Sequence, residues 1–288
     1  MKFSVIGGDR RIAKLSESLA RDGHIVKSFA LEKAGDIPGV SAEDTVKDCL
    51  DGADCVVLPL PLSDKWAILT SPLSEGEYPV DEIFSEISPT SVVCAGMANE
   101  TCHGLAKAHG IEIIDYYERE ELVIKNAIVT AEAAIEILIR ETARTIWQSK
   151  ILVLGNGRVG KVLAGRLLLL GADVSVSARR HEDFALIEGM GCKSLDSNFL
   201  GENLSEFDMI INTVPAMILT PERLTHIRKD ALILDLASKP GGCDFESASN
   251  LGLNVVWSLG LPGKSAPITA GDIIKETIYN ILEEQSNG

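Results

Sequence analysis

Short apolar runs alternate with helical or polar stretches along the whole chain, and this alternation predicts the fold class. In the first half, runs typical of buried strands stand at Phe3–Ile6, Ile25–Val26, Cys55–Leu58, Ser91–Cys94 and Ile111–Ile114. In the second half, similar runs stand at Ile151–Leu154, Asp173–Ser177, Met209–Asn212, Leu232–Asp235 and Asn254–Trp257. Strands that alternate with helices at this spacing form a parallel sheet covered on both faces. The sequence therefore predicts an α/β protein with two doubly wound, Rossmann-like domains.

Helical periodicity predicts how the two halves are joined. Helices are expected over about Arg11–Arg21 and Val159–Leu170, and a longer one over Ala127–Gln148, because apolar residues recur there at helical spacing. No Gly/Pro-rich linker separates the halves, so we expect a rigid helix that crosses between the domains, with Asn126 as its N-cap. We expect a substrate-binding and catalytic domain at residues 1–126 and a cofactor-binding domain at residues 149–269, joined by the crossing helix at residues 127–148. By analogy with two-domain dehydrogenases, the last helix, within residues 270–288, completes the first domain.

Composition narrows the class of partner and the compartment. The chain has 288 residues and a formal net charge of -15, which argues against nucleic acid and anionic membrane surfaces as partners. Neither a signal peptide nor an apolar run of membrane-spanning length is present, so a cytoplasmic location is expected. The six cysteines are scattered without a C-x-x-C pair, and no set of four spaced zinc ligands is found, so no metal site is predicted.

A glycine pattern follows the first strand of the second half. The strand Ile151–Leu154 leads directly into a turn and a helix, and the turn reads Gly155, Asn156, Gly157, Arg158, Val159, Gly160. In such a turn the first glycine allows the tight bend, the second admits the pyrophosphate, and the third lets helix and strand pack closely. The helix N-terminus then offers N–H groups to the phosphates. This setting between strand and helix predicts a nicotinamide-dinucleotide site.

The end of the next strand bears on the choice of cofactor. NAD-binding domains usually carry Asp or Glu there, whereas this chain has Ser177, Ala178, Arg179 and Arg180. A hydroxyl and two guanidinium groups suit a 2′-phosphate, and no carboxylate is expected at this place to repel it. The sequence therefore predicts NADP in preference to NAD. The alternative is that both arginines are merely solvated loop charges.

Two further strand ends point to the same crevice, since ligands of open α/β sheets lie beyond the carboxyl ends of strands. Thr213, Val214 and Pro215 follow one strand and are expected near the nicotinamide ribose. Asp235 and Ala237 follow the next and are further cofactor candidates, although Asp235 is equally well explained as a structural loop carboxylate.

Candidate substrate groups come from three loops. Arg10 and Arg11 begin a helix after Gly7-Gly8-Asp9, where their positive charges oppose the helix dipole and lower stability. An anionic ligand at this place is one reason why two arginines would be tolerated there. Lys264 lies in a stiff Gly/Pro-containing loop, and Asn99 follows a strand of the first domain. An ordinary turn and an ordinary strand-to-helix connection remain the alternatives. None of the five histidines stands in a hydride-transfer motif, which disfavours a common 2-hydroxyacid dehydrogenase.

Five motifs together resemble the A subunit family of dipicolinate synthases from spore-forming bacteria. They are I-G-G-D-x-R at Ile6–Arg11, N-A-I-x-T-A-E at Asn126–Glu132, the turn at Gly155–Gly160, D-L-A-S-K-P-G-G at Asp235–Gly242, and G-L-P-G-K-x-A-P-x-T-A-G at Gly260–Gly271. The resemblance covers nearly the whole chain. More distantly, the second half is similar to the cofactor domains of D-2-hydroxyacid and alanine dehydrogenases.

The resemblance implies a function and a partner. Members act with a flavoprotein-like B subunit, and both subunits are needed to make dipicolinate in the mother cell during sporulation. The substrate comes from the lysine pathway, as 4-hydroxytetrahydrodipicolinate or as a dihydrodipicolinate-type intermediate. A cyclic dicarboxylate substrate needs separate cations, and Arg10 or Arg11 and Lys264 are the candidates, expected on opposite domains. Aromatisation would drive hydride loss to NADP⁺, so little general-base power would be needed.

Two other interpretations stay open. One is a stand-alone NAD(P)-dependent dehydrogenase of a small amino or hydroxy acid, and the other is a non-catalytic NADP-binding scaffold. Because two-domain dehydrogenase folds often dimerise, a homo-oligomer also stays open.

Overall fold

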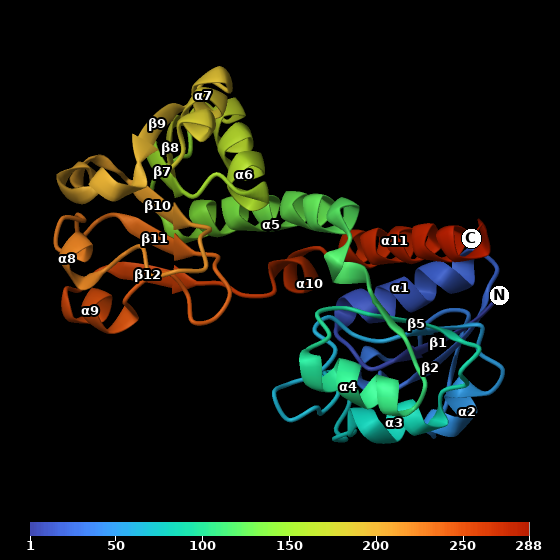
Figure 1. The fold of residues 1–288 in the computed structure, drawn as a ribbon. Coiled ribbons are helices and arrows are strands. Elements are labelled where there is room, and N and C mark those ends of the chain that lie inside the picture. The colour runs from blue at the N-terminus through green and yellow to red at the C-terminus, as the bar shows by residue number, and fades with distance from the viewer. Residues whose placement is uncertain (288) are drawn as a thin grey trace. The chain divides into compact units, whose positions relative to one another are not determined.

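The computed structural model describes residues 1–287, apart from the side chain of Glu202, and divides the chain into two units. Unit 1 contains residues 1–126 and the C-terminal segment from Pro262, whereas unit 2 is Ala127–Leu261. Helix α5 (Glu120–Glu141) spans the boundary between them. Figure 1 shows a parallel sheet flanked by helices in each unit.

Unit 1 is built on a six-stranded parallel sheet with the order β3-β2-β1-β4-β5-β6. Its strands are β1 (Lys2–Ile6), β2 (Ile25–Phe29), β3 (Val40–Ala42), β4 (Cys55–Val57), β5 (Val92–Ala95) and β6 (Ile113–Asp115). Its helices are α1 (Arg10–Arg21), α2 (Val46–Leu50), α3 (Val80–Glu86), α4 (Glu100–Ala108), α10 (Leu261–Ser265, whose first residue is in unit 2) and α11 (Pro267–Asn287), with 3-10 turns at Glu32–Ala34 and Tyr116–Glu118.

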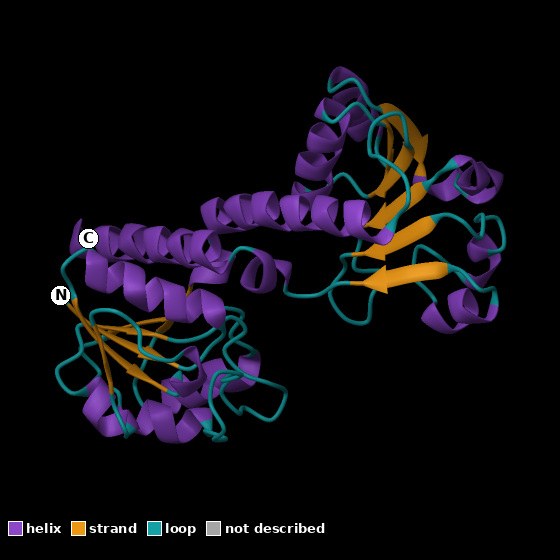
Figure 2. Ribbon diagram, turned by 180° about the vertical axis from the view of Figure 1, so that it is seen from behind, coloured by secondary structure: helices purple, strands orange, loops and turns teal. Residues whose placement is uncertain are grey.

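The C-terminal helix is an integral part of unit 1. Helix α11 lies along α1 in both ribbon views (Figures 1 and 2), and its buried residues include Ile274 and Ile278. Gly271 allows close approach, because a Cβ there would lie 2.7 Å from the carbonyl oxygen of Arg11. The chain therefore returns to its first domain after completing the second.

Unit 2 repeats the same strand order, read as β9-β8-β7-β10-β11-β12. Its strands are β7 (Lys150–Leu154), β8 (Asp173–Ala178), β9 (Lys193–Asp196), β10 (Met209–Asn212), β11 (Leu232–Asp235) and β12 (Asn254–Trp257). Its helices are α6 (Arg158–Leu169), α7 (His181–Gly189), α8 (Pro221–Leu224) and α9 (Phe245–Asn250), with 3-10 turns at Ser197–Phe199 and Gly201–Glu206.

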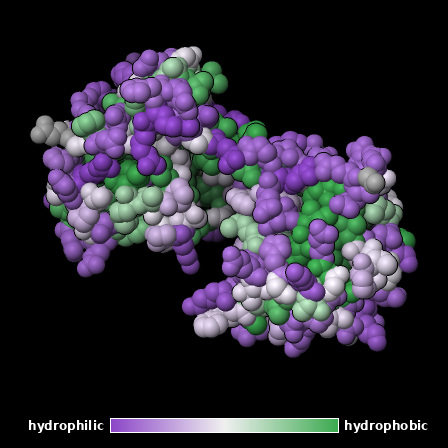
Figure 3. Space-filling view, in the orientation of Figure 1, coloured by the Kyte–Doolittle hydropathy of each residue, from purple (hydrophilic) through white to green (hydrophobic). Residues whose placement is uncertain are grey.

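Both faces of the sheet in unit 2 are buried, as the apolar runs predict. Ile151 and Val153 of β7 pack into the core on one face, and Leu152 and Leu154 pack into the core on the other. Polar side chains cover much of the visible surface of each unit, with smaller apolar areas between them (Figure 3). The predicted α/β class with two Rossmann-like parallel sheets is confirmed.

Several predicted element boundaries were wrong. The crossing helix begins at Glu120, so Asn126 lies inside it and is not its N-cap. It ends at Glu141, well before the predicted Gln148. Just after this end, the Thr142 hydroxyl donates to the carbonyl of Leu138. The predicted loop at 261–271 instead forms α10 and the start of α11, which opens with Pro267, a residue that suits a first helical turn.

Candidate functional site

The turn between β7 and α6 has the conformation that its glycines predict. Gly155 has a φ of 101°, a left-handed conformation that side chains disfavour. A Cβ on Gly160 would lie 2.1 Å from the carbonyl oxygen of Gly155, so only glycine fits. Gly157 is the N-cap of α6 and supplies no capping side chain. The N-terminus of α6 therefore has no side-chain cap from Gly157, and the backbone N–H groups of a helix N-terminus suit an anion.

A hollow of about 600 Å³ opens over this turn. It brings together nine predicted cofactor residues, namely Gly155, Asn156, Gly157, Ser177, Arg179, Arg180, Thr213, Val214 and Pro215. The remaining lining residues are Ala178, Asp183, Ser197 and Ile218. Arg158, Val159 and Gly160 lie in the first turn of α6 and do not line it.

Two observations show that the hollow suits a dinucleotide. A Cβ built on Gly157 would meet nothing within 4 Å, so the backbone is open to a ligand there. The Oδ1 atom of Asn156 is buried without a hydrogen-bond partner among the described residues. A buried acceptor without a donor is costly, and a ligand hydroxyl would satisfy it.

At the far end of the hollow the two arginines differ. Arg179 is exposed and pairs with no described residue. Arg180 donates from Nε to Asp183 at 2.9 Å, and its Nη1 atom forms an ion pair with Glu182 at 2.7 Å. The hydrogen bond with Asp183 raises the pKa of Arg180, and the same bond lowers the pKa of the Asp183 carboxyl.

The expectation that no carboxylate stands at this end was wrong. Asp183 lies in the first turn of α7, is 8% exposed and lines the hollow. Sequence reasoning considered only the strand end and missed the first turn of the following helix. Acidic residues are favoured in the first turn of a helix, so Asp183 could have been considered from the sequence as a side chain beside this strand end.

Asp235 has the structural role that the sequence left open beside a cofactor contact. Its carboxylate is completely buried and accepts hydrogen bonds from the Asn212 side chain at 2.9 Å, from the Ala237 amide at 2.9 Å and from the Gly242 amide at 2.7 Å. The carbonyl of Ala237 accepts from Trp257. Asp235 and Ala237 therefore tie together the loops that follow β10 and β11, and neither lines the hollow.

The first turn of unit 1 is closed by its own side chains. Asp9 caps α1 by accepting from the Arg11 amide at 2.9 Å. The Arg11 guanidinium pairs with the Asp9 carboxylate at 2.9 Å and donates to the Leu60 carbonyl at 2.8 Å. Arg11 is 8% exposed, so its guanidinium joins the segments that follow β1 and β4, whereas the sequence predicted a substrate cation at Arg10 or Arg11.

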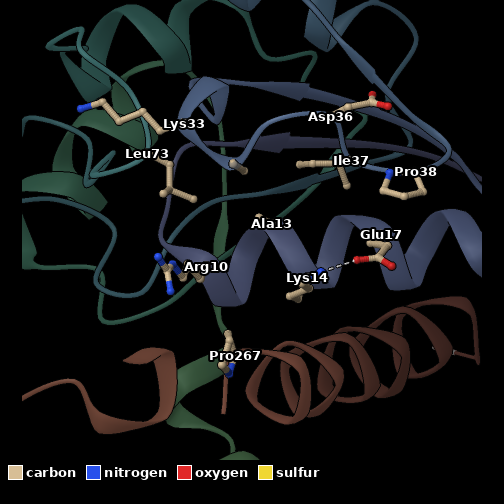
Figure 4. A pocket seen from close by; sticks show the side chains of 11 residues that line it. Arg10, Ala13, Lys14, Glu17, Lys33, Asp36, Ile37, Pro38, Leu73 and Pro267 are labelled. Atoms are coloured by element: carbon tan, nitrogen blue, oxygen red, sulfur yellow. Dashed lines mark hydrogen bonds and ion pairs between the residues drawn. The ribbon is translucent and has the colours of Figure 1, made fainter. Parts of the chain in front are cut away.

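Arg10 lines a second hollow, which lies entirely within unit 1 and measures about 560 Å³. In Figure 4, Arg10 and Lys14 project from α1, with Lys33 on the segment that follows β2. Lys14 and Lys33 pair with Glu17 and Glu75, respectively, whereas Arg10 pairs with no described residue. The hollow therefore contains one unpaired and two paired cations.

The other substrate candidates lie elsewhere in unit 1. Lys264 is exposed on α10 and belongs to the same unit as Arg10, so the expectation of cations from opposite domains was wrong. Asn99 caps α4 by accepting from the Cys102 amide at 2.9 Å, so its side-chain oxygen has a structural partner. Among the described residues, no histidine lines either hollow.

Two features are absent from the described residues. No group of three or more His, Cys, Asp or Glu side chains within them could hold a metal ion. None of the helices they form is long and apolar enough to cross a membrane.

The strand order, the glycine turn and the hollow over it define a Rossmann-type protein with an NAD(P)-binding dehydrogenase-type domain in unit 2. A family model described as the N-terminal domain of the dipicolinate synthase A subunit matches residues 2–117, and one described as the alanine dehydrogenase/PNT C-terminal domain matches residues 118–256. The dipicolinate synthase A subunit of Bacillus subtilis (strain 168) is 32% identical over 289 residues, which cover 99% of this chain and 96% of that protein. The chain therefore belongs to the family of dipicolinate synthase A subunits.

Solved structures agree with this assignment. The crystal structure of the dipicolinate synthase A subunit from Bacillus halodurans superposes with a TM-score of 0.88 at 29% identity, covering 98% of this chain and 97% of that one. The transhydrogenase from Sinorhizobium meliloti has a TM-score of 0.73 at 17% identity, covering 98% and 94%, and shares the fold alone.

Proposed function

We propose that this chain is the NADP-dependent oxidoreductase subunit of a dipicolinate synthase. It oxidises a dihydrodipicolinate-type intermediate to dipicolinate, together with a flavoprotein-like B subunit, in the mother-cell cytoplasm of a sporulating bacterium. The observation that carries the proposal is the joint occurrence of an open phosphate-binding turn in unit 2 and full-length similarity to the A subunit.

The preference for NADP rests on Arg179. Its guanidinium is exposed at the end of the hollow where the adenosine ribose of a dinucleotide would lie, and no described carboxylate pairs with it. A planar guanidinium binds a phosphate through two parallel, charge-assisted hydrogen bonds, whereas a neutral ribose hydroxyl can accept only weaker hydrogen bonds from it. Ser177 also lines the hollow, but it is 1% exposed and its hydroxyl accepts from the Gly155 amide at 3.4 Å, so the contact with a 2′-phosphate is proposed for Arg179.

The proposed substrate is a cyclic dicarboxylate, and Arg10 and Lys264 are the proposed groups for its carboxylates. Both are exposed cations of unit 1, and neither pairs with a described carboxylate. Arg11 acts indirectly, because its ion pair with Asp9 fixes the turn from which Arg10 projects. Asn99 is assigned no catalytic role, since it caps α4.

The reaction removes a hydride and a proton from the dihydropyridine ring, which becomes aromatic. When bound, an oxidised nicotinamide supplies the hydride acceptor. The chain's residues orient the two partners through the turn at Gly155–Gly160 and through the proposed cations. Because aromatisation favours loss of the proton to water once the hydride has left, the proposal requires no histidine base.

The test mixes the chain, the B subunit, the substrate and NADP⁺ without oxygen. We expect equimolar NADPH and dipicolinate, followed by absorbance at 340 nm and by terbium luminescence. Dipicolinate formed without NADPH would reject the oxidoreductase assignment and favour a scaffold role. Turnover of alanine or glycerate by the chain alone would favour a stand-alone dehydrogenase.

Substituting the proposed cations separates catalysis from scaffolding. Arg10→Ala and Lys264→Ala should lower turnover while leaving NADPH binding intact and the complex with the B subunit undisturbed. Unchanged turnover in both variants would remove these residues from the proposed site.

A further inference from the structure

Asp183 stands where the adenosine end of a dinucleotide would lie, and it contacts both sides of the hollow. One carboxylate oxygen accepts from the Asn156 side chain at 3.0 Å, and the other accepts from Arg180 Nε at 2.9 Å. Its side chain is 11% exposed, whereas that of Arg180 is 68% exposed. A single buried carboxylate therefore connects the phosphate-binding turn to the strand end that lies nearest the ribose.

We propose that Asp183 is a positioning residue that sets the NADP-to-NAD preference of this protein. It orients the amide of Asn156 toward a ribose hydroxyl, and it holds Arg180 in an ion pair that weakens its attraction for a 2′-phosphate. This inference rests on the proposed dinucleotide binding by unit 2.

The first part of the argument concerns Asn156. An ionised carboxylate can only accept hydrogen bonds, so it faces the NH₂ group of the amide. The Oδ1 atom must then point away from Asp183, and it is the atom that is buried without a partner among the described residues. An orphan acceptor requires a donor, and a ribose hydroxyl is a donor, whereas an ionised phosphate is not. Asp183 thus prepares a contact that NAD and NADP can share.

The second part concerns charge. Two guanidinium groups and one carboxylate, those of Arg179, Arg180 and Asp183, line this end of the hollow, and Glu182 adds a second carboxylate that pairs with Arg180. The two acids balance the two arginines. A 2′-phosphate therefore meets one cation without a described partner, Arg179, and a second cation whose charge is largely compensated.

The test replaces Asp183 with asparagine and measures equilibrium binding of NADPH and NADH to the full chain by nicotinamide fluorescence. The new amide in Asp183→Asn can still accept from Asn156, but it carries no charge to hold Arg180. We expect NADPH to bind about three- to fivefold more tightly, the size of a released surface ion pair, with NADH changed less than about twofold. An unchanged affinity ratio, or equal weakening of both cofactors, would overturn the proposal.

Two matched variants isolate the cause. Asp183→Glu keeps the charge, so the NADPH-to-NADH affinity ratio should stay at the wild-type value even if both affinities fall. Glu182 is the other carboxylate that pairs with Arg180, and its side chain is 67% exposed. Glu182→Gln should therefore change the NADPH-to-NADH affinity ratio less than Asp183→Asn does. A larger effect at Glu182 would contradict a special role for the buried carboxylate.

Failure of the inference and failure of the proposed function give different results. Wild-type protein that binds neither NADPH nor NADH would reject the cofactor assignment. Wild-type protein that binds one or both, with a ratio that Asp183→Asn leaves unchanged, would reject only the role of Asp183.

Discussion

The turns that follow β1 in unit 1 and β7 in unit 2 occupy the same place in the same strand order, yet they treat the next helix differently. In unit 2, Gly157 leaves the N-terminus of α6 open. In unit 1, the equivalent N-cap is Asp9, whose carboxylate accepts from the first turn of α1. Three residues after the N-cap, unit 2 has Gly160 and unit 1 has Ile12.

The comparison shows how few residues separate a ligand site from a structural turn. In unit 1 a capping carboxylate occupies the position that a phosphate would take, and the guanidinium of Arg11 neutralises it. The Ile12 side chain also lies against Gly8, where a Cβ would be 2.5 Å from Ile12 Cγ1. One fold thus carries both functions, and the fold alone does not decide between them.

The largest expected effect comes from closing the open turn. Gly157→Ala should weaken NADPH binding on the order of a hundredfold, because a methyl group would displace the pyrophosphate from the backbone. The thermal midpoint without cofactor should stay nearly unchanged, since the new Cβ meets nothing within 4 Å. Fluorescence titration and calorimetry measure the two quantities.

Gly165→Ala is the matched control for that experiment. It lies in the same helix, and its Cβ would also meet nothing within 4 Å. It should leave binding unchanged. If both variants bound NADPH like the wild type, the turn at Gly155–Gly160 would not be the cofactor site.

The next effect comes from opening the closed turn. Asp9→Ala removes the cap of α1 and leaves the guanidinium of Arg11, whose side chain is 9% exposed, without its carboxylate. We expect a loss of about 2 kcal/mol in the free energy of unfolding, measured with urea. NADPH binding by unit 2 should not change. The exposed Asp44, replaced by Ala, serves as a control with little effect on stability.

A smaller effect tests what the open turn binds. Arg179→Ala should weaken NADPH binding about tenfold through loss of a bidentate phosphate contact, with NADH binding unaffected. Titration of both cofactors measures this. Lys229→Ala, an exposed cation of the same unit, should affect neither. Equal losses for both cofactors would contradict a contact with the 2′-phosphate.

The smallest effect concerns the packing of α11 in unit 1. Hydrogen bonds from Lys275 and Tyr279 lower the pKa of Asp22 below its ordinary value of 3.8. A carboxyl pKa that is lowered in the folded state stabilises the fold at pH values above the ordinary pKa. This stabilisation is lost as the pH falls through the folded-state pKa. Asp22→Asn should therefore cost less than about 1 kcal/mol at pH 7 and nothing in strong acid. Urea unfolding at neutral pH and in strong acid compares the variant with the wild type, and a cost that persists in acid would contradict an ionic origin.

The sequence predicted the elements whose signal is local. The strands at Met209–Asn212, Leu232–Asp235 and Asn254–Trp257 have the predicted boundaries because each is an apolar run between polar segments. The short outer strands Val40–Ala42 and Lys193–Asp196 were missed, since they carry few apolar residues and owe their conformation to a neighbouring strand. Glycine requirements are local too, which is why the turn of unit 2 could be recognised.

The candidate site was predicted only in part, because side-chain partners depend on tertiary structure. Nothing in the pattern around Asp235 tells that three donors surround its carboxylate. Likewise, Arg10 and Arg11 are adjacent in sequence, but one faces a hollow and the other is held by Asp9 and Leu60. Asp183 escaped notice because its place beside Asn156 follows from how α7 folds back on the strand ends.

The return of α11 to unit 1 has a consequence for synthesis. On the ribosome the helix α1 appears first, but the segment that covers it, from Pro267, appears only after all of unit 2. Unit 2 is continuous, so every segment that builds its core precedes α11 in the chain. The face of α1 that packs against α11, where Gly271 lies beside the backbone of Arg11 and Leu15, stays uncovered until α11 has emerged. A chain truncated before Pro267 and released from the ribosome should thus have a protease-resistant unit 2 and a protease-sensitive unit 1.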